Sequence, residues 1–119
     1  MGLKSREKGA PQESHYVFMW NVTDAAATNL NNLKAAMRTA SGMVRDLGGT
    51  CRLYVTTGGE YDFVGIARGI TDAQASQLRL AVDGLGQVKT TTFFKLQDYT
   101  LDEFDGHVDA STKLLKAKP

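Results

Sequence analysis

Apolar residues recur along the chain with two different periods, and these periods divide it into strands and helices. The run His15–Val22 is rich in aromatic and β-branched residues and contains no Gly or Pro, which predicts a strand. A helix is predicted next, because six apolar side chains recur at steps of three and four: Leu30, Leu33, Met37, Ala40, Val44 and Leu47. The pair Gly48-Gly49 predicts the end of this helix, since glycine adopts the left-handed conformation of a C-terminal cap.

The rest of the chain predicts three further strands and two further helices. The strand-like runs Cys51–Thr57 and Asp62–Arg68 flank a glycine-containing loop, which is typical of a β-hairpin. The pattern at Thr71–Gln74 is that of a capping box and predicts the start of the second long helix. Val88–Leu96 is predicted to form the fourth strand, and a second capping box at Thr100–Glu103 predicts a short terminal helix.

The resulting order, β-α-β-β-α-β, predicts a ferredoxin-like α+β fold. Such a fold is a four-stranded antiparallel sheet of strand order 4-1-3-2 with two helices on one face. We expect one domain over residues 15–110, preceded by a disordered tail over residues 1–14 and followed by a basic tail over residues 111–119.

The predicted strands are apolar on both faces, which favours a partner. The first strand directs one set of apolar side chains to each face of the sheet: Tyr16, Phe18 and Trp20 to one, Val17 and Met19 to the other. Two helices can cover only one face, and a second apolar face favours burial against another surface. A second copy of the same sheet is the simplest cover, so we predict a homodimer. The alternative is a monomer whose terminal helix folds across that face.

Composition excludes several classes of function. With 42% hydrophobic and 23% charged residues the chain is typical of a soluble globular protein. Its net charge of +1 creates no field that would attract nucleic acid or an anionic membrane. It contains no run of about 18 apolar residues, and Cys51, its only cysteine, fits a reducing cytoplasm. The two histidines, His15 and His107, do not have metal-ligand spacing, so we expect neither a metal nor a cofactor.

Two further possibilities are weighed and set aside. A thiolate pair of Cys51 and His15 is not expected, because the strands that they open are predicted to run in opposite directions with the third strand between them. RNA-recognition domains share this element order, but their third strand carries a basic-Gly-aromatic motif. Here that strand reads EYDFVGIAR, which lacks the motif.

The loop Glu60-Tyr61-Asp62 is the first candidate for binding. Carboxylates in a hairpin loop can orient a ligand amine or act as a general base. The structural alternative is that Asp62 accepts hydrogen bonds from loop N–H groups and that Tyr61 packs at the strand entrance.

Three further side chains are candidates. Trp20 and Tyr54 could line a ligand pocket between the helices and the sheet, or could belong to the core or an interface. Arg38 could bind a carboxylate or phosphate, or could be a solvated charge on a helix. The pattern identifies no catalytic residue.

The sequence also resembles a known family. Residues 59–64 (GEYDFV), preceded by Leu47-Gly48-Gly49 and followed by residues 86–92 (GQVKTTT), resemble the GYD domain family over about residues 15–105. This resemblance implies a dimeric ferredoxin-like α/β barrel from bacteria, and it implies no particular activity. A looser similarity is to the effector-binding domain of Lrp/AsnC-type regulators, where the corresponding loop lies near a small-metabolite site between subunits. A helix-turn-helix does not precede the domain in this sequence.

Three functions are compatible with these observations. We expect a cytoplasmic, homodimeric module that binds a small metabolite or has a regulatory role. The first alternative is a small cofactor-independent enzyme, of monooxygenase or isomerase type, that uses the same pocket. The second is a structural or assembly partner whose sheet face docks another protein.

Overall fold

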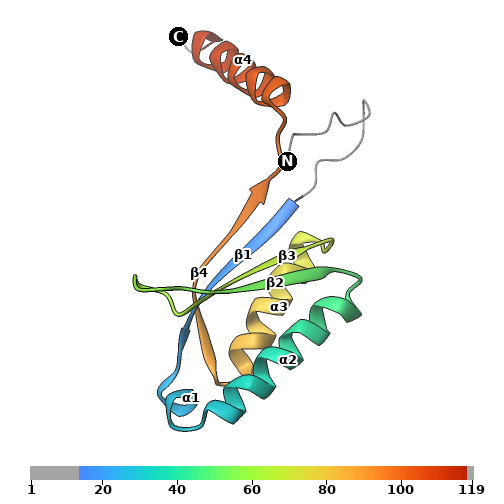
Figure 1. Ribbon diagram of the computed structural model, residues 1–119. Helices are drawn as coiled ribbons and strands as arrows, with labels where there is room; N and C mark the ends of the chain where they lie inside the picture. Colours follow the sequence, from blue (N-terminus) through green and yellow to red (C-terminus); the bar gives the residue numbers. More distant parts are fainter. Residues whose placement is uncertain (1–13, 118–119) are drawn as a thin grey trace. The chain divides into compact units, whose positions relative to one another are not determined.

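The computed structural model describes residues 14–117 (Figure 1). Of these, residues 14–96 and residues 97–117 form two separate compact parts. The elements follow in the order β1 (Ser14–Val22), α1 (Asp24–Thr28), α2 (Leu30–Asp46), β2 (Thr50–Val55), β3 (Phe63–Arg68), α3 (Asp72–Gly84), β4 (Val88–Gln97) and α4 (Leu101–Ala117). This order confirms the predicted β-α-β-β-α-β core, with α1 as an additional short helix.

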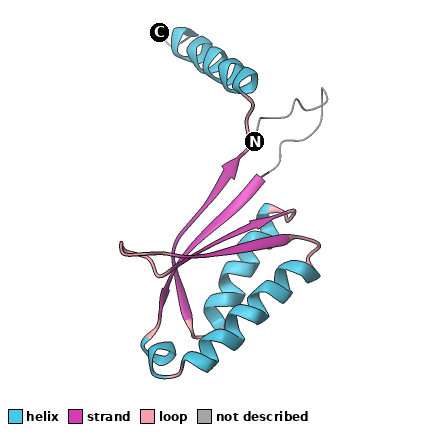
Figure 2. Ribbon diagram, viewed as in Figure 1, coloured by secondary structure: helices cyan, strands magenta, loops and turns pink. Residues whose placement is uncertain are grey.

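The four strands form one sheet in the order β2-β3-β1-β4, which is the predicted order read from the other edge. β3 is antiparallel to both of its neighbours: Ala67 lies opposite Tyr16 in β1 and opposite Cys51 in β2. Helices α2 and α3 lie on one face of this sheet (Figure 2). The predicted ferredoxin-like α+β fold is therefore confirmed.

One predicted strand direction is wrong. β1 and β2 are parallel to each other, because each pairs antiparallel with β3. His15 and Thr50 both lie opposite Arg68, so His15 and Cys51 start their strands at the same end of the sheet. The two side chains still do not meet: β3 separates the strands by two spacings, about 10 Å, and the register places them on opposite faces.

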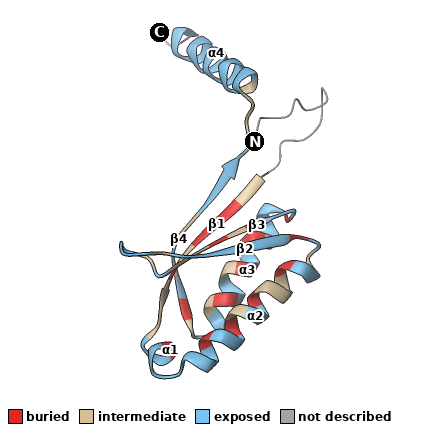
Figure 3. Ribbon diagram, in the orientation of Figure 1, coloured by how far each residue is buried: buried red, intermediate tan, exposed pale blue. Residues whose placement is uncertain are grey.

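The core lies between the sheet and the two long helices. Tyr16, Phe18 and Trp20 point to the helix side and are at most 6% exposed. The helices cover them with short or branched side chains, listed here in chain order: Leu33, Ala36, Ala40 and Val44 from α2, then Ala75, Leu78 and Val82 from α3 (Figure 3). Most of the predicted α2 stripe is confirmed, but Leu30, in the first turn, is 66% exposed. The helices thus cover the aromatic face of β1 and leave the face of Val17 and Met19 on the other side.

Helix starts follow the local sequence. Asn29 separates α1 from α2 and caps the latter, since its Oδ1 accepts the Asn32 N–H at 3.4 Å. Both predicted capping boxes are confirmed. At α3, Thr71 and Gln74 exchange side-chain-to-backbone hydrogen bonds of 3.0 and 3.1 Å. At α4, Thr100 makes the same exchange with Glu103 at 2.9 and 3.2 Å.

The end of α2 depends on two glycines. Gly48 has a φ of +86° and donates its N–H to the Arg45 carbonyl at 2.9 Å, while the Gly49 N–H reaches the Val44 carbonyl at 3.0 Å. This pair of bonds is a Schellman cap. A Cβ at position 49 would lie 2.5 Å from the Arg68 carbonyl oxygen, so the close turn into β2 requires glycine there as well.

The terminal helix is longer than predicted. α4 continues to Ala117, so residues 111–117, predicted as part of a tail, are helical. The sequence from 107 to 117 contains no Gly or Pro, and Ser111 and Thr112 direct their hydroxyls back to the carbonyls of His107 and Val108 at 2.9 Å. Ser14 already belongs to β1. The remainder of the predicted N-terminal tail, residues 1–13, lies outside the described residues.

Candidate functional site

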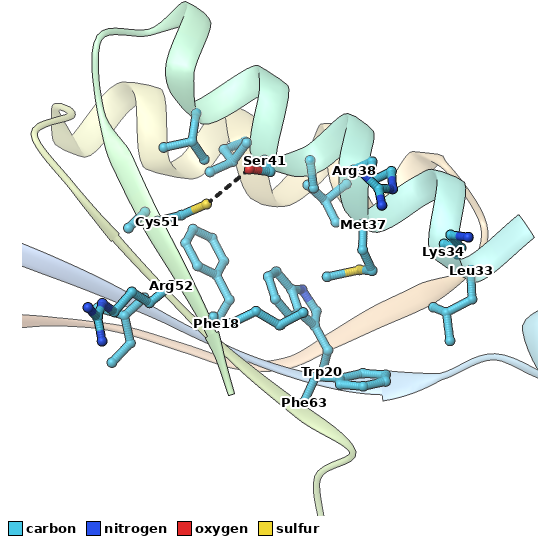
Figure 4. A pocket seen from close by; sticks show the side chains of 18 of the residues that line it. Phe18, Trp20, Leu33, Lys34, Met37, Arg38, Ser41, Cys51, Arg52 and Phe63 are labelled. Carbon is cyan, nitrogen blue, oxygen red and sulfur yellow. Dashed lines mark hydrogen bonds between the residues drawn. The ribbon is translucent and has the colours of Figure 1, made fainter. Parts of the chain in front are cut away.

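An apolar groove opens between α2 and the β2 side of the sheet (Figure 4). Its volume is about 600 Å³. Phe18 and Trp20 from β1 form its floor, and six further side chains define its walls: Leu33, Met37 and Ser41 from α2, and Cys51, Leu53 and Phe63 from the β2–β3 hairpin.

The groove exists because the helix layer leaves the edge strand β2 exposed. In β2, Cys51, Leu53 and Val55 lie opposite Ala67, Gly65 and Phe63, and so belong to the helix side of the sheet. All six residues of β2 are nevertheless exposed, and Leu53 remains 48% exposed. An apolar side chain that faces the helix layer but stays half exposed forms a wall that a ligand can cover.

The floor of the groove is built around Trp20. A Cβ at Gly65 would lie 2.5 Å from two carbons of the indole ring, so the ring occupies the space that glycine leaves free. The ring stacks on Phe18 with centroids 5.6 Å apart. Its Nε1 donates to the Thr90 hydroxyl at 3.0 Å, and that hydroxyl donates to Asp83 at 2.6 Å. The hydrogen-bond chain fixes the indole in a single orientation.

Charge is distributed unevenly around the groove. Lys34 and Arg38 line it from α2, one helical turn apart, and no Asp or Glu of the described range lines it. Arg52 also borders it, but its side chain belongs to the other face of the sheet, because Arg52 lies opposite Ile66 and Ile66 lies opposite Val17. At one end the Cys51 thiol lies 3.6 Å from the Ser41 hydroxyl (Figure 4). The groove therefore combines apolar walls with one cationic rim.

The structure separates the predicted site residues. Trp20 and Arg38 line the groove. Tyr54 does not: it lies opposite Val64 in the register, which places it on the face away from the helices. The prediction that Tyr54 walls a pocket between helices and sheet is therefore wrong, because the register of β2 directs its side chain to the opposite face.

The loop residues Glu60, Tyr61 and Asp62 do not line the groove. Asp62 accepts the Val22 N–H at 2.8 Å through Oδ2 and donates its own N–H to the Trp20 carbonyl at 2.9 Å. The Tyr61 hydroxyl lies 2.8 Å from that of Thr92. These contacts are structural, as in the alternative, but the N–H that Asp62 accepts belongs to Val22 at the end of β1 rather than to the loop.

A second polar cluster, which the sequence pattern did not reveal, joins Tyr16, Asp72 and Lys95. The buried Tyr16 hydroxyl donates to Asp72 in the first turn of α3, and the Lys95 ammonium lies 3.0 Å from the same carboxylate. Burial, and then the bond to Asp72, raise the pKa of Tyr16 to about 12, while the bonds from Tyr16 and Lys95 lower the pKa of Asp72. The cluster ties the start of α3 to β1 and β4.

Within residues 14–117, no three His, Cys, Asp or Glu side chains come together as a metal site would require. None of the helices in this range is both long and apolar enough to cross a membrane.

An open four-stranded sheet with two helices on one face places the molecule among α+β proteins of ferredoxin-like fold. Residues 16–108 match the model of the GYD domain, and the chain belongs to the GYD domain family. No curated protein matches the chain.

Solved structures with this arrangement include a dimeric ferredoxin-like protein of unknown function from Thermobifida fusca. It is 9% identical, with a TM-score of 0.50 over 75% of this chain and 92% of that one. The de novo designed protein Ferredog-Diesel is 7% identical, with a TM-score of 0.49 over 81% and 96% of the two chains. The C-terminal domain of MgtC from Mycobacterium tuberculosis is 12% identical, with a TM-score of 0.35 over 79% and 94%. At these identities the likeness concerns the fold alone.

Proposed function

We propose that the protein is a homodimeric module that binds a small, largely apolar molecule in the groove between α2 and the sheet. One observation carries this proposal: a groove of about 600 Å³ with a fixed aromatic floor. Sites for small molecules typically have volumes of roughly 300–1,000 Å³ and predominantly apolar walls. Leu53, which is about half exposed, would lose water when a ligand binds.

Binding rather than catalysis is favoured by the side chains of the groove. They include no Asp, Glu or His among the described residues, so a general base is not supplied there. Cys51 is the one thiol, and its neighbour is the Ser41 hydroxyl rather than a proton acceptor of basic character. A free, exposed thiol suits a reducing compartment, and we include the cytoplasm in the proposal.

The second half of the proposal concerns the face of the sheet that α2 and α3 leave uncovered. We call it the open face. Its apolar members that keep exposed surface are Met19, Tyr54, Val64 and Ile66, whereas Val17 on the same face is already buried. A second copy packed on the open face would bury Tyr54, which is 46% exposed. The groove lies on the opposite side of the sheet, so dimerisation there leaves both grooves accessible. The Thermobifida fusca protein of the same fold is itself described as dimeric.

The test is a titration with N-phenylnaphthylamine, an uncharged dye whose emission rises in apolar surroundings. We expect one saturable site per chain. Leu53→Asp places a charge in the groove wall and should weaken binding at least tenfold, because burying an unpaired carboxylate under the dye is costly. Leu80→Asp is the matched control, since Leu80 is an exposed leucine of α3 that does not line the groove. Equal binding to both variants would contradict the proposal.

A further inference from the structure

We infer that the ligand is an organic anion with an apolar body, held by its head group at Lys34 and Arg38. This inference rests on the proposed function and names the class of molecule that the same groove accepts. A medium-chain carboxylate has the required chemistry: one acidic group that the two cations recognise, and a chain that the walls cover.

The two cations form a site because of their spacing. Lys34 and Arg38 are four residues apart on α2, so their side chains are neighbours on the helix surface. Two like charges at this spacing repel each other. No carboxylate of residues 14–117 forms an ion pair with either of them. A ligand carboxylate between them would relieve the repulsion and accept hydrogen bonds from both, with the guanidinium able to donate two.

The electrostatics of the walls point the same way. An anion entering the groove meets two cations on the α2 rim and, among the described lining residues, no Asp or Glu that would repel it. A ligand with a cationic head would meet Lys34 and Arg38 without a counter-charge. A neutral ligand would use the walls but gain nothing from the rim. Electrostatic complementarity therefore selects an anion.

The length of the groove suits an extended chain. Its α2 wall runs from Leu30 to Val44, which corresponds to about 21 Å along a helix. Lys34 and Arg38 lie in the middle of this wall, and Figure 4 shows both on α2 with Met37 and Leu33 beside them. The head group can thus sit at the exposed rim while the chain runs along Met37 and over Trp20.

The experiment compares decanoate with decanol as competitors of bound N-phenylnaphthylamine. The two molecules have the same chain length and differ in the charged group. We expect decanoate to displace the dye at about tenfold lower concentration than decanol, because charge-assisted hydrogen bonds are formed only by the carboxylate. The preference should shrink at high salt, since the cations lie at an exposed rim.

A double variant assigns the preference to these residues. Lys34→Met with Arg38→Met keeps the apolar stems and removes both charges. The decanoate preference over decanol should fall to about one in this variant. Arg45→Met is the matched control, because Arg45 is another exposed cation of α2 that does not line the groove, and this variant should keep the preference.

The outcomes separate the two proposals. Failure of the dye to bind wild-type protein contradicts the proposed function. Dye binding with equal competition by decanoate and decanol leaves the groove in place and overturns the inferred anion. A decanoate preference that persists in the double variant overturns the assignment to Lys34 and Arg38.

Discussion

The close contact between the Trp20 ring and Gly65 predicts that a larger residue at position 65 lowers stability, whether or not a ligand binds. In Gly65→Ala the new methyl group would lie 2.5 Å from two indole carbons, where ordinary contacts start at about 3.4 Å. The indole must therefore move by about 1 Å. It can do so only by changing its stacking on Phe18 and the hydrogen bond from its Nε1 to Thr90.

The size of the effect follows from the cost of overpacking a core, which is about 1–3 kcal/mol. For a folded domain of this size, each kcal/mol lowers the melting temperature by about 4–8 °C. We expect Gly65→Ala to lower Tm by at least about 4 °C. The emission of Trp20, the single tryptophan, should change as well, because its surroundings change.

The assay is thermal unfolding followed by circular dichroism, with Gly42→Ala as the matched control. Gly42 lies inside α2, and a Cβ there meets no atom within 4 Å. Gly42→Ala should therefore stabilise the protein by roughly 0.5–1 kcal/mol through helix propensity. The same substitution thus has opposite signs at the two positions. A Gly65→Ala protein as stable as wild type would refute the packing described for the groove floor.

Three further predictions concern other parts of the molecule. Because the pKa of Tyr16 is raised in the folded protein, the unfolded chain loses the phenol proton first, and the free energy of unfolding should fall between pH 10 and about 12. In urea unfolding at several pH values, Tyr16→Phe should remove the part of this fall that Tyr16 causes. A pH profile identical to that of wild type would contradict the raised pKa. Asp62→Ala should lower the free energy of unfolding by about 0.5–1.5 kcal/mol, because the Val22 N–H loses its acceptor, and the affinity for the dye should stay within about twofold of wild type. A large loss of dye affinity would show that the loop takes part in binding. Tyr54→Glu should convert the proposed dimer to the 12.9 kDa monomer in light scattering, whereas Leu80→Glu should not. If Tyr54→Glu stays dimeric, the open face is not the interface.

The elements were predictable because local signals and the fold agree. The stripe along α2, the glycines after it and the two capping boxes each act over a few residues, and the sequence displays all of them. The strand order then follows from the element order. The end of α4 was predicted too early, although residues 107–117 contain no Gly or Pro and the helix continues through them.

The groove was only partly predictable, because it depends on register and on where a helix stops covering a sheet. Alternation in β2 alone does not show whether Leu53 or Tyr54 faces the helices; the pairing of Leu53 with Gly65 decides it. Likewise Thr90 orients the Trp20 ring, but within the predicted strand Val88–Leu96 nothing local distinguishes it from its neighbours. Contacts between residues 70 positions apart leave no local signal in the sequence.

The central claim is that a ligand binds in the groove, and protection of Cys51 from chemical modification tests it most directly. Cys51 is the single cysteine of the sequence and lines the groove, so its reactivity reports on that place alone. The measurement is the rate at which N-ethylmaleimide modifies Cys51 with and without saturating N-phenylnaphthylamine, with glutathione as a control for any effect of the dye on the reagent. If the dye occupies the groove, the modification rate should fall at least tenfold, and the protection should be absent in Leu53→Asp. An unchanged rate on fully dye-bound protein would show that the ligand binds elsewhere and would contradict the account.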